Sequence, residues 1–479
     1  MRTAYSVETV RTAERALMAR LPEGALMQRA AAGLAVACAE LLGRVYGSRI
    51  VLLVGSGDNG GDALYAGARL ARRGAGVAAV LLAPERTHAE GLAAFRRAGG
   101  RTVGPGGGED AVLRADLVVD GIVGIGGTGG LRPDAERLAG FAAEARVPVV
   151  AVDLPSGVEA DSGEVRGAAV RADLTVTFGT HKPALLIDPA REYAGSVRLV
   201  DIGLGDVLPE EPGLEALQHA DVAALLPVPG AESDKYRRGV VGIAAGSARY
   251  PGAAVLAVAG ALRGGAGAVR YVGPAADAVI ARFPEVLVSD QGPKHAGRVQ
   301  AWVVGPGAAD DASVVGEVVS ADVPVLIDAD GLRLADRDAV RGRTAPTLMT
   351  PHAGEAAALL GVAREEVEGA RLASARELAA RYGATVLLKG STTLIADAAG
   401  GAVRVNSTGT GWLATAGSGD VLSGLAGSLL AAGLSALDAG SVAAYLHGLA
   451  GRLASDGAPV GAHDVAEAVV RAWRDVRDQ

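Results

Sequence analysis

The sequence is poor in the residues that build disulfide-rich, aromatic-rich or basic proteins. Cys38 is the only cysteine among 479 residues, which excludes an intrachain disulfide and a cysteine-ligated metal site. Aromatic residues make up 3% of the chain, and this scarcity favours tightly packed α/β layers over an all-β sandwich. Basic residues number 46 against 54 acidic residues, so the net charge of −8 argues against nucleic acid or an acidic membrane surface as a partner.

Long uncharged hydrophobic runs are also scarce. Residues 1–21 are charged and predicted to be helical, and they lack the apolar core of a signal peptide. The uncharged stretch 421–437 falls short of a comfortable bilayer span and is expected to form a buried helix. We therefore expect a cytoplasmic protein with no membrane partner. With 479 residues, of which 49% are apolar, the chain is predicted to form two globular domains.

Strands alternate with helical segments in the first half, and this alternation predicts a parallel α/β sheet. After N-terminal helices that end near Leu42, strands are expected at 49–54, 76–82, 117–119, 147–152 and 174–178. Prolines, glycines and acidic residues then cluster at 208–230, which indicates a boundary near residue 215.

A second α/β series follows the boundary, with strands expected at 239–245, 301–304, 323–327, 347–349 and 385–388. Each of these strands ends in a polar or glycine-rich loop. Because ligands bind beyond the carboxyl ends of strands in open α/β sheets, the second half is predicted to be an enzyme. No repeat of 20–50 residues is present, so the chain is expected to hold two different domains, 1–215 and 216–479.

The segment Asn406–Gly424 is the most informative of the chain. Gly417 and Gly419 allow a tight turn just before an apolar helix, so the backbone N–H groups of 417–419 can point at one spot with the helix dipole behind them. This predicts an anion hole for a phosphoryl group, formed by Gly417, Ser418 and Gly419. Asp420 is placed to take a proton from the hydroxyl that is phosphorylated. As an alternative, Ser418 or Asp420 merely caps a buried helix.

Gly55–Gly60 matches the dinucleotide-binding pattern G-x-G-x-x-G, which is weak evidence by itself. We expect a loop over Gly55–Asp62 and a helix from there to about Arg73. A dehydrogenase would also need an acidic residue closing the next strand for the ribose. The only candidate, Glu85, follows Pro84 and is expected to lie in a loop.

Two further loops point at the same predicted sheet edge. Asp120 and Asp153 each follow a buried strand, and a glycine-rich segment, Gly121–Gly130, comes after the first. Either carboxylate alone could simply cap a turn. Together with the amide of Asn59 and the hydroxyl of Ser156, however, they form a set of oxygen ligands of low charge, which suits a monovalent or hard cation.

Three motifs of the first half are NGGD at 59–62, the glycine-rich loop after Asp120, and VDLPSG at 152–157. Together with SVETVRTAERAL and LMQRAA near the N-terminus, they resemble the epimerase domain of the bifunctional NAD(P)H-hydrate repair enzymes. The resemblance implies a Rossmann-like three-layer domain that interconverts R and S hydrates. It implies that K⁺ is held by Asn59, Asp120 and Ser156. It implies that the hydrated nucleotide contacts Asp58, Asn59, Gly60, Gly61, Asp62, Gly124, Ile125, Gly126, Gly127, Thr128, Gly129, Gly130 and Asp153.

The chemistry expected for this site starts from the hydroxyl on carbon 6, next to the ring nitrogen. The hydrated ring can lose and regain hydroxide through an iminium, or it can open and reclose. We predict that Asp153 shuttles the proton. Two residues depart from the family pattern NNGGDG, because Asp58 and Ala63 stand where the family has Asn and Gly.

Six motifs of the second half resemble, in order, the ribokinase-like dehydratase domain of the same family. They are Lys235–Gly239, Gly246–Ser247, Gly305–Gly307, Pro351–Glu355, Lys389–Thr393 and Ala416–Asp420. The resemblance implies that the hydrated cofactor contacts Ala253, Gly307, His352 and Asp420. It implies that the AMP part of a nucleotide co-substrate is held by Lys389, Gly390, Ser391, Thr392, Thr393 and Gly419. Thr410 and Ala416 stand where the family often has Asn and Gly.

The resemblance implies ADP-dependent dehydration of the S hydrate, with Mg²⁺ offsetting the phosphate charges. Phosphorylation would turn the poor leaving group hydroxide into phosphate, which the ring nitrogen can expel. Residue by residue, alternatives stay open: His352 could be a turn residue, Lys389 a solvated strand end, and Glu355 a first-turn helix acid or a group that orients the metal. The sequence does not separate ADP from ATP. A homo-oligomer is expected by analogy.

Three other functions are compatible with parts of the pattern. A ribokinase-like vitamin kinase fused to an inert domain would release a stable phosphorylated product. The N-terminal half could instead be a nucleotide-binding scaffold or sensor. A nicotinamide dehydrogenase ranks last, because the acidic residue for the ribose is missing.

Overall fold

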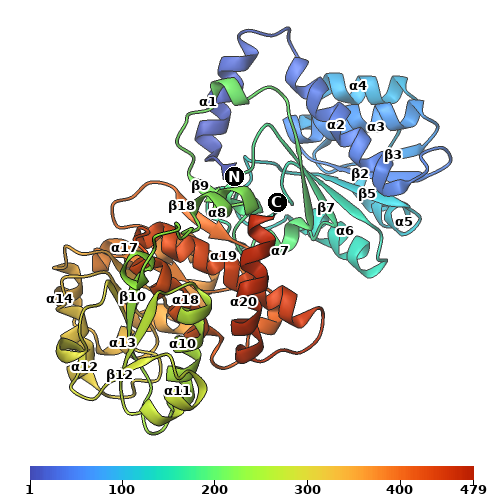
Figure 1. Cartoon of the computed structure of the whole chain (residues 1–479). Helices are drawn as coiled ribbons and strands as arrows, with labels where there is room; N and C mark the ends of the chain where they lie inside the picture. The colour runs from blue at the N-terminus through green and yellow to red at the C-terminus, as the bar shows by residue number, and fades with distance from the viewer. Residues whose placement is uncertain (479) are drawn as a thin grey trace. The chain divides into compact units, whose positions relative to one another are not determined.

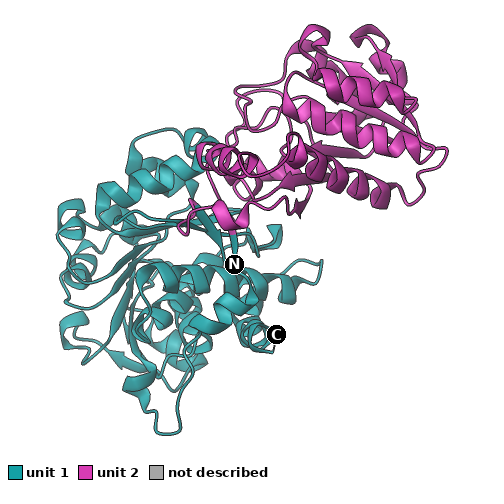
Figure 2. Ribbon diagram, turned by 90° about the horizontal axis from the view of Figure 1, so that it is seen from above, with its two compact units in different colours: residues 1–2, 214–479 teal, residues 3–213 magenta. Residues whose placement is uncertain are grey.

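The computed structural model describes residues 1–478 and divides into two compact units. One unit, called the N-terminal unit below, comprises Thr3–Gly213; the other, the C-terminal unit, comprises Met1–Arg2 and the chain from Leu214 onward (Figure 2). Each unit has its own sheet with helices on both faces (Figure 1).

The sheet of the N-terminal unit has seven parallel strands in the order β4-β3-β2-β5-β6-β7-β8. The strands are β2 (Arg49–Val54), β3 (Gly76–Leu81), β4 (Arg101–Val103), β5 (Leu117–Gly121), β6 (Val149–Val152), β7 (Leu174–Phe178) and β8 (Ser196–Val200). The strand order reverses between β2 and β5, as in a Rossmann sheet, and ligands of such sheets bind at this reversal. The predicted parallel α/β sheet is confirmed.

Helices cover both faces of this sheet. They are α1 (Val7–Met18), α2 (Ala25–Leu42), α3 (Asp58–Arg72), α4 (Ala89–Arg97), α5 (Gly108–Leu113), α6 (Pro133–Glu144) and the short α7 (Arg191–Ala194). In β2, Ile50 and Leu52 face the core formed with α2 and α3, whereas Val51 and Leu53 face the core formed with α5 and α6. This alternation follows from the two-residue period of a strand, and it gives the expected Rossmann-like three layers.

By length and composition, α2 is apolar enough to cross a membrane. Its Leu34, Ala35 and Cys38 are nevertheless buried in the core of the N-terminal unit, where α2 packs against α3. Core helices of globular proteins pass the same test of length and composition, so this helix is weak evidence for a membrane segment.

The second sheet has eleven strands in the order β1-β9-β18-β17-β16-β15-β14-β13-β10-β11-β12, of which all but β1 lie wholly within the C-terminal unit. They are β1 (Arg2–Ala4), β9 (Leu214–Ala216), β10 (Val240–Ala244), β11 (Ala268–Val272), β12 (Leu287–Ser289), β13 (Ala301–Val304), β14 (Val325–Ile327), β15 (Thr347–Met349), β16 (Thr385–Leu388), β17 (Thr393–Ala396) and β18 (Val403–Asn406). The run from β16 to β12 is parallel, and β17 pairs antiparallel with both β16 and β18.

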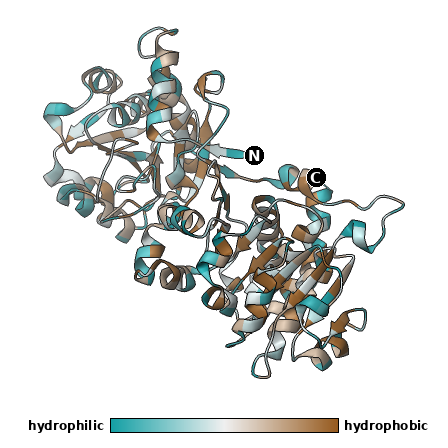
Figure 3. Cartoon of the chain, turned by 90° about the vertical axis from the view of Figure 1, so that its left-hand side faces the viewer, coloured by the Kyte–Doolittle hydropathy of each residue, from teal (hydrophilic) through white to brown (hydrophobic). Residues whose placement is uncertain are grey.

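Helices also cover both faces of this second sheet. They are α8 (His219–Leu225), α9 (Lys235–Arg238), α10 (Pro251–Arg263), α11 (Ala276–Arg282), α12 (Ala312–Val319), α13 (Asp330–Leu334), α14 (Arg337–Arg341), α15 (Ala353–Leu360), α16 (Arg364–Gly369), α17 (Arg371–Tyr382), α18 (Ser418–Ala431), α19 (Ala436–Ser455) and α20 (Ala462–Arg477). The largest core lies where α10, α18, α19 and α20 pack together and onto the strands. In both units, the brown of hydrophobic residues appears on strands and on helices (Figure 3).

The uncharged stretch 421–437 forms the buried body of α18, a turn, and the first residues of α19. Helix α18 packs directly on α10 through glycines. A Cβ atom at Gly260 would overlap the carbonyl oxygen of Val421, and one at Gly424 would overlap that of Ala257. The two helices therefore approach backbone to backbone, which only glycine at these positions permits.

Candidate active sites

The first candidate site lies at the carboxyl edge of β5 and β6 in the N-terminal unit. Asn59 and Asp62 were expected in a loop, but α3 begins at Asp58 and includes both of them in its first turns. A Cβ atom at Gly124 would lie 2.9 Å from Asn59 Oδ1, and one at Gly121 would lie 3.3 Å from the Asn59 carbonyl oxygen. The structure therefore brings the glycine-rich segment after β5 against Asn59, as the motif pattern predicts.

Asp120 and Ser156 form a buried hydrogen-bonded pair beside this contact. The Ser156 hydroxyl donates to Asp120 Oδ1 at 2.6 Å, and the Ser156 N–H donates to Asp120 Oδ2 at 2.8 Å. The Ile122 N–H also reaches Oδ1, at 3.3 Å. Burial raises the pKa of Asp120 to about 6, although the hydrogen bonds from Ser156 oppose the shift. Asp120 lies within β5, which continues to Gly121, and does not close the strand as expected.

The oxygen atoms at Asp120 suit a weakly charged cation. Across residues 1–478, no group of three or more His, Cys, Asp or Glu side chains is arranged to hold a metal ion. The set here is different, with the Asp120 carboxylate, the Ser156 hydroxyl and the Val123 carbonyl oxygen, which lies 3.1 Å from that hydroxyl. A single carboxylate among neutral oxygens fits K⁺ better than a transition metal. Asn59 contributes an amide whose Nδ2 is buried without a hydrogen-bond partner.

Asp153 is held in an uncommon backbone conformation at the end of β6. Its φ is +66°, which few non-glycine residues adopt. The side chain accepts a short hydrogen bond from the ammonium of Lys182, and Oδ1 also accepts from the Thr177 hydroxyl at 3.0 Å and the Phe178 N–H at 3.3 Å. One carboxylate oxygen is therefore saturated by protein donors. A strained residue whose side chain is so firmly held is typical of a functional site.

Lys182 is 1% exposed, and sequence reasoning missed it. Its ammonium donates to Asp153, to Thr177 Oγ1 at 3.0 Å and to the Phe178 carbonyl oxygen at 3.1 Å, so all three protons are used. A lysine is rarely buried unless it is paired. The signal that could have found it is its position in the loop after β7, the neighbour of β6, because Asp153 follows β6 at the same edge of the sheet.

Further carboxyl groups surround Lys182. Asp62 is buried, and its Oδ1 has no hydrogen-bond partner. Burial raises the pKa of Asp62 well above its usual value, and the negative charges of Asp153 and Asp58 add to the shift. Burial likewise raises the pKa of Glu14 on α1, which sequence reasoning also missed. A buried carboxyl group with a free acceptor atom is suited to bind a hydroxyl or amide of a ligand.

The remaining residues of the predicted nucleotide contact form a loop that other segments hold in place. The Gly129 N–H donates to Glu159 Oε1 at 2.8 Å, and a Cβ atom at Gly130 would lie 2.9 Å from Gly167. A Cβ atom at Gly126 would lie 3.2 Å from Arg11 Nη2, so this loop runs beside α1. In the same loop, Ile125 packs against two buried apolar clusters, the Gly127 N–H donates to the Gly124 carbonyl oxygen at 3.0 Å, and Thr128 follows.

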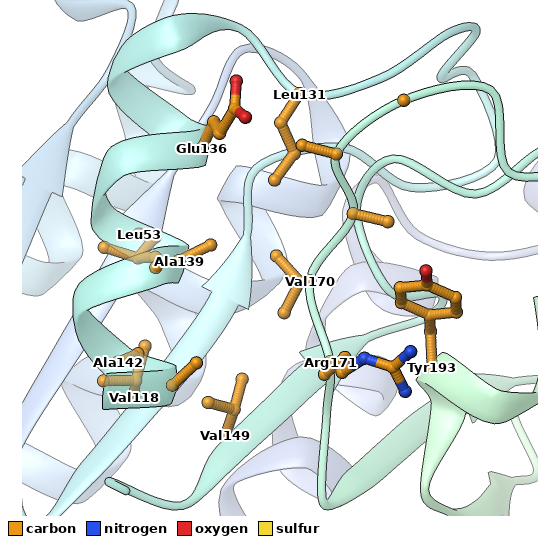
Figure 4. Close-up of a pocket in the computed structure, with 15 residues that line it drawn as sticks. Leu53, Val118, Leu131, Glu136, Ala139, Ala142, Val149, Val170, Arg171 and Tyr193 are labelled. Carbon is orange, nitrogen blue, oxygen red and sulfur yellow. The ribbon is translucent and has the colours of Figure 1, made fainter. Parts of the chain in front are cut away.

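A separate cavity of about 330 Å³ lies between α6 and the segment 167–171. Glu136 and Ala139 on α6 face Val170, Arg171 and Tyr193 across it (Figure 4). Its floor consists of apolar side chains of β2, β5 and β6 that point away from α3. None of the predicted site residues lines this cavity.

The second candidate site lies at the carboxyl edge of the parallel strands in the C-terminal unit. The Gly246 N–H donates to the Pro306 carbonyl oxygen at 2.7 Å, which joins the loops after β10 and β13. A Cβ atom at Gly307 would lie 2.7 Å from the Cβ atom of Ala253, so the predicted substrate residues Gly307 and Ala253 are in contact.

A buried ion pair connects the next loops. Asp328, at the end of β14 and 1% exposed, accepts from Lys389 Nζ at 2.8 Å and from the Ser423 hydroxyl at 2.6 Å. Burial acts to raise the pKa of Asp328, but Lys389 and Ser423 hold it below its usual value. The Lys389 side chain is 19% exposed, so the alternative of a solvated strand end is wrong. Sequence reasoning missed Asp328 and Ser423.

The helix that follows the glycine-rich loop has no side-chain cap. Its N-cap is Gly417, with a φ of +87°, and the Ser418 hydroxyl turns away to donate to the Leu413 carbonyl oxygen at 2.7 Å. The capping alternative for Ser418 and Asp420 is therefore wrong. Burial raises the pKa of Asp420 to about 7, with a further contribution from the negative charge of Asp328. A carboxyl group that titrates near neutral pH is suited to general base catalysis.

His352 and Glu355 form a capping box at the start of α15. The His352 N–H donates to Glu355 Oε2 at 2.7 Å, and the Glu355 N–H donates to His352 Nδ1 at 3.1 Å. His352 is the N-cap residue in the turn before α15 and Glu355 lies in the first turn of the helix, in agreement with one of the alternatives for each. The His352 side chain is 59% exposed and therefore accessible to a ligand.

The loop Lys389–Thr393 is folded around a buried arginine of α17, Arg371, which sequence reasoning also missed. Arg371 Nη2 donates to the carbonyl oxygens of Lys389 and Thr392, each at 3.0 Å, and packs against Gly390. The Lys389 N–H donates to the Pro351 carbonyl oxygen at 2.8 Å, which joins this loop to the one after β15. Ser391 lies in the same loop, and Thr393 begins β17.

Thr410 and Ala416, which depart from the family pattern, do not disturb the end of the glycine-rich loop at 417–419. Thr410 caps the short 3₁₀ turn Gly411–Leu413, accepting from the Trp412 N–H at 3.4 Å. Ala416 is exposed just before Gly417.

Comparison with known proteins agrees with this division into two sites. Residues 23–184 match the family model described as YjeF-related protein N-terminus, and residues 241–471 match the model described as NAD(P)H-hydrate dehydratase. The chain is 51% identical over 464 residues to the bifunctional NAD(P)H-hydrate repair enzyme Nnr of Mycobacterium leprae, covering 95% of this chain and 94% of that protein. It is 52% identical over 443 residues to the enzyme of the same name from Mycobacterium tuberculosis, covering 91% and 90%.

Among solved structures, the ADP/ATP-dependent NAD(P)H-hydrate dehydratase of Bacillus subtilis, co-crystallised with ATP and Mg²⁺, is 31% identical. The match has a TM-score of 0.50 and covers 55% of this chain and 99% of that one, which confirms the ribokinase-like fold. With two domain models in the expected order and relatives matched along nearly their whole length, the chain belongs to the family of bifunctional NAD(P)H-hydrate repair enzymes.

Proposed function

We propose that the N-terminal unit interconverts the R and S hydrates of NAD(P)H, and that the C-terminal unit dehydrates the S hydrate with ADP, releasing AMP and phosphate. The observation that carries the proposal is the presence of two complete polar centres on one chain. The first joins Asp120, Ser156 and the Asp153–Lys182 pair. The second joins Asp328, Lys389 and the start of α18. A vitamin kinase with an inert first domain does not require the first centre.

Epimerisation in this proposal needs a group that moves a proton at the hydroxyl on carbon 6. The C6–O bond breaks to give an iminium at the ring nitrogen, and water adds to the opposite face. Asp153 carries the proton, because Lys182, Thr177 and Phe178 hold one of its oxygens and leave the other for the substrate. Asp62 binds the substrate through its unpartnered Oδ1.

The oxygens of Asp120, Ser156 and Asn59 would hold K⁺ in the first site, in agreement with the low charge of this set. A bound K⁺ would supply a positive charge that orients the substrate. In the second site, Mg²⁺ would accompany the nucleotide and offset the charge of its phosphates.

Dehydration in this proposal begins when Asp420 takes the proton of the C6 hydroxyl. The oxygen attacks the terminal phosphorus of ADP, the bond to the bridging oxygen breaks, and AMP leaves. The amides of 417–419 stabilise the transferred phosphoryl group. The C6–O bond then breaks to release phosphate, and loss of the proton on carbon 5 restores the dihydronicotinamide. Ala253, Gly307 and His352 contact the hydrated ring, and 389–393 with Gly419 hold the nucleotide.

The test uses the full chain with a mixture of R and S NADH hydrates, K⁺ and Mg²⁺, with ADP, with ATP, or with neither. The absorbance of reformed NADH is followed, and AMP, ADP and phosphate are assayed. Conversion of both epimers that depends on ADP and yields AMP is expected. Conversion that stops when the S hydrate is spent would remove the epimerase assignment. No NADH with either nucleotide would remove the dehydratase assignment.

Two variants separate the activities. Asp153→Asn should abolish acceleration of epimerisation and leave dehydration of the S hydrate, whereas Asp420→Asn should do the reverse. Asp277→Asn, an exposed acidic residue on α11, is the matched control and should change neither. An Asp153→Asn variant that epimerises at the normal rate would remove Asp153 from the mechanism. The homo-oligomer and the cytoplasmic location stay predictions.

A further inference from the structure

The backbone and the side chain of Lys389 serve two different parts of the second site. Its backbone begins the loop 389–393 and is fixed by Arg371 and Pro351. Its side chain leaves that loop and reaches toward the start of α18. A Cβ atom at Gly419 would lie 3.5 Å from Lys389 Nζ, which places the ammonium next to the proposed anion hole.

The surroundings of this ammonium are strongly acidic. Asp328 Oδ1 lies 2.8 Å away, and Glu355 Oε2 lies 3.8 Å away. Asp420 is close enough to interact with it electrostatically. Burial acts to lower the pKa of Lys389, but the negative charges of Asp328 and Glu355 outweigh it and raise this pKa. The side chain therefore stays a cation.

We propose that the Lys389 side chain is a catalytic group that binds the phosphoryl group during its transfer, and that it does not hold the AMP part of the nucleotide. Asp328 and Ser423 are then positioning residues, because they orient the ammonium without touching the substrate. This inference rests on the proposed phosphorylation of the hydrate by the C-terminal unit.

The charge balance of the transfer requires such a group. When Asp420 takes the hydroxyl proton, the substrate oxygen bonds to phosphorus, and the bond between phosphorus and the bridging oxygen breaks. During the transfer, negative charge spreads over the three oxygens of the phosphoryl group, and afterwards it is carried by the phosphorylated substrate and by AMP. Lys389 keeps its protons throughout and stabilises this charge, as the adjacent amides do. Its partial pairing with Asp328 prevents it from drifting to Asp420.

The competing explanation is that the Lys389–Asp328 pair is only structural. Two observations count against it. Buried ion pairs contribute little net stability, so a structural role alone gives weak reason to bury both charges. The Lys389 side chain also remains 19% exposed, and its ammonium lies 3.5 Å from where a Cβ atom at Gly419 would be, at the start of α18.

The test separates binding of AMP from transfer of the phosphoryl group. In Lys389→Met, kcat for dehydration of the S hydrate should fall on the order of 100- to 1000-fold, with ADP or with ATP, in keeping with the loss of one donor to a developing anion. The dissociation constant of AMP, measured by calorimetry, should change less than about threefold. Lys294→Met removes an exposed lysine of the same unit and should change neither quantity.

Chemical rescue provides a readout that a structural role would not give. Ethylammonium added to Lys389→Ala should restore part of kcat, and it should have no effect on Lys294→Ala. If Lys389→Met fails to fold, the double variant Lys389→Met, Asp328→Leu removes both charges of the pair. The double variant should have a melting temperature close to that of the wild-type protein and should not catalyse dehydration.

Three results would overturn the inference. A loss of AMP affinity above about tenfold with kcat for bound nucleotide nearly unchanged would return Lys389 to the AMP site. If kcat and the dissociation constant of AMP were both unchanged in Lys389→Met, the Lys389–Asp328 pair would be only structural. An active Lys389→Met, Asp328→Leu variant would also show that the pair is only structural. Wild-type protein runs in parallel with ADP and with ATP, and if it forms no NADH the proposed function itself has failed.

Discussion

The rate of dehydration should rise with pH through about 7, because Asp420 must be ionised to accept the hydroxyl proton. Burial, together with the negative charges of Asp328 and Asp330, raises the pKa of Asp420 to about 7 against the opposing charge of Lys389. His447 is a further titratable group near the anion hole, beside the Ser418 backbone, and burial lowers its pKa to about 4. It therefore stays neutral in this range and adds no second step.

The magnitude follows from the fraction of Asp420 that is ionised. With a pKa of about 7, roughly a tenth of the protein is active at pH 6 and roughly nine tenths at pH 8, so the rate should rise about tenfold between them. Removing a charge next to Asp420 should shift the dependence of the rate on pH, and the sign of that charge determines the direction of the shift. Asp328→Asn should shift it to lower pH, and Lys389→Met should shift it to higher pH.

The assay is a single turnover of the S hydrate with saturating ADP and excess enzyme, so that product release does not hide the chemical step. NADH absorbance is recorded from pH 5.5 to 8.5 in buffers of constant ionic strength (about 0.1 M), with a blank lacking enzyme at each pH. A flat profile would refute the role of Asp420 as the base. Shifts of the two variants in the same direction would refute the electrostatic argument.

Three further predictions concern the N-terminal unit and the packing of helices. Lys182→Met leaves its buried carboxylate partner unpaired and should cost about 3–5 kcal/mol of stability. Its melting temperature should fall and epimerisation should slow, while dehydration persists. Asp62→Asn should keep most epimerisation, since it keeps the acceptor Oδ1 and burial already raises the pKa of Asp62 well above its usual value; complete loss would make it an acid catalyst. Gly424→Ala forces a methyl group onto the α10 backbone and should lower the melting temperature, whereas Gly316→Ala, with open space around it, should not.

The parallel strands were the part of the fold that the sequence predicts best. β2, β7, β13, β15 and β16 have the expected bounds, because a strand buried on both faces reads as a continuous apolar run. β17 and β18 were missed, since a run of four residues between glycine-rich and polar segments is too short for its pattern to be told from a loop. β5 is longer than expected because Asp120, although charged, still pairs within the sheet opposite Leu53 and Ala151.

The candidate sites were predictable where a motif follows a strand end. The Asp120–Ser156 contact and the Gly307–Ala253 contact involve residues that the motifs had already singled out. Lys182 and Arg371 were not predictable in this way. A single charged residue in a sequence is normally expected at the surface, and only the folded structure shows which carboxylate or carbonyl oxygens surround it.

The glycine contacts between α10 and α18 bear on how the second site can move. Because Gly260 and Gly424 bring the two backbones together, no layer of side chains is left between the helices that could rearrange and let one slide past the other. Ala253 and Asp420 therefore travel as one rigid body. Opening for ADP entry and AMP exit is therefore expected in the segments 352–355 and 389–393, which are held by the His352–Glu355 capping box and by hydrogen bonds from Arg371. Hydrogen exchange during turnover should accordingly be fast in these loops and slow along both helices.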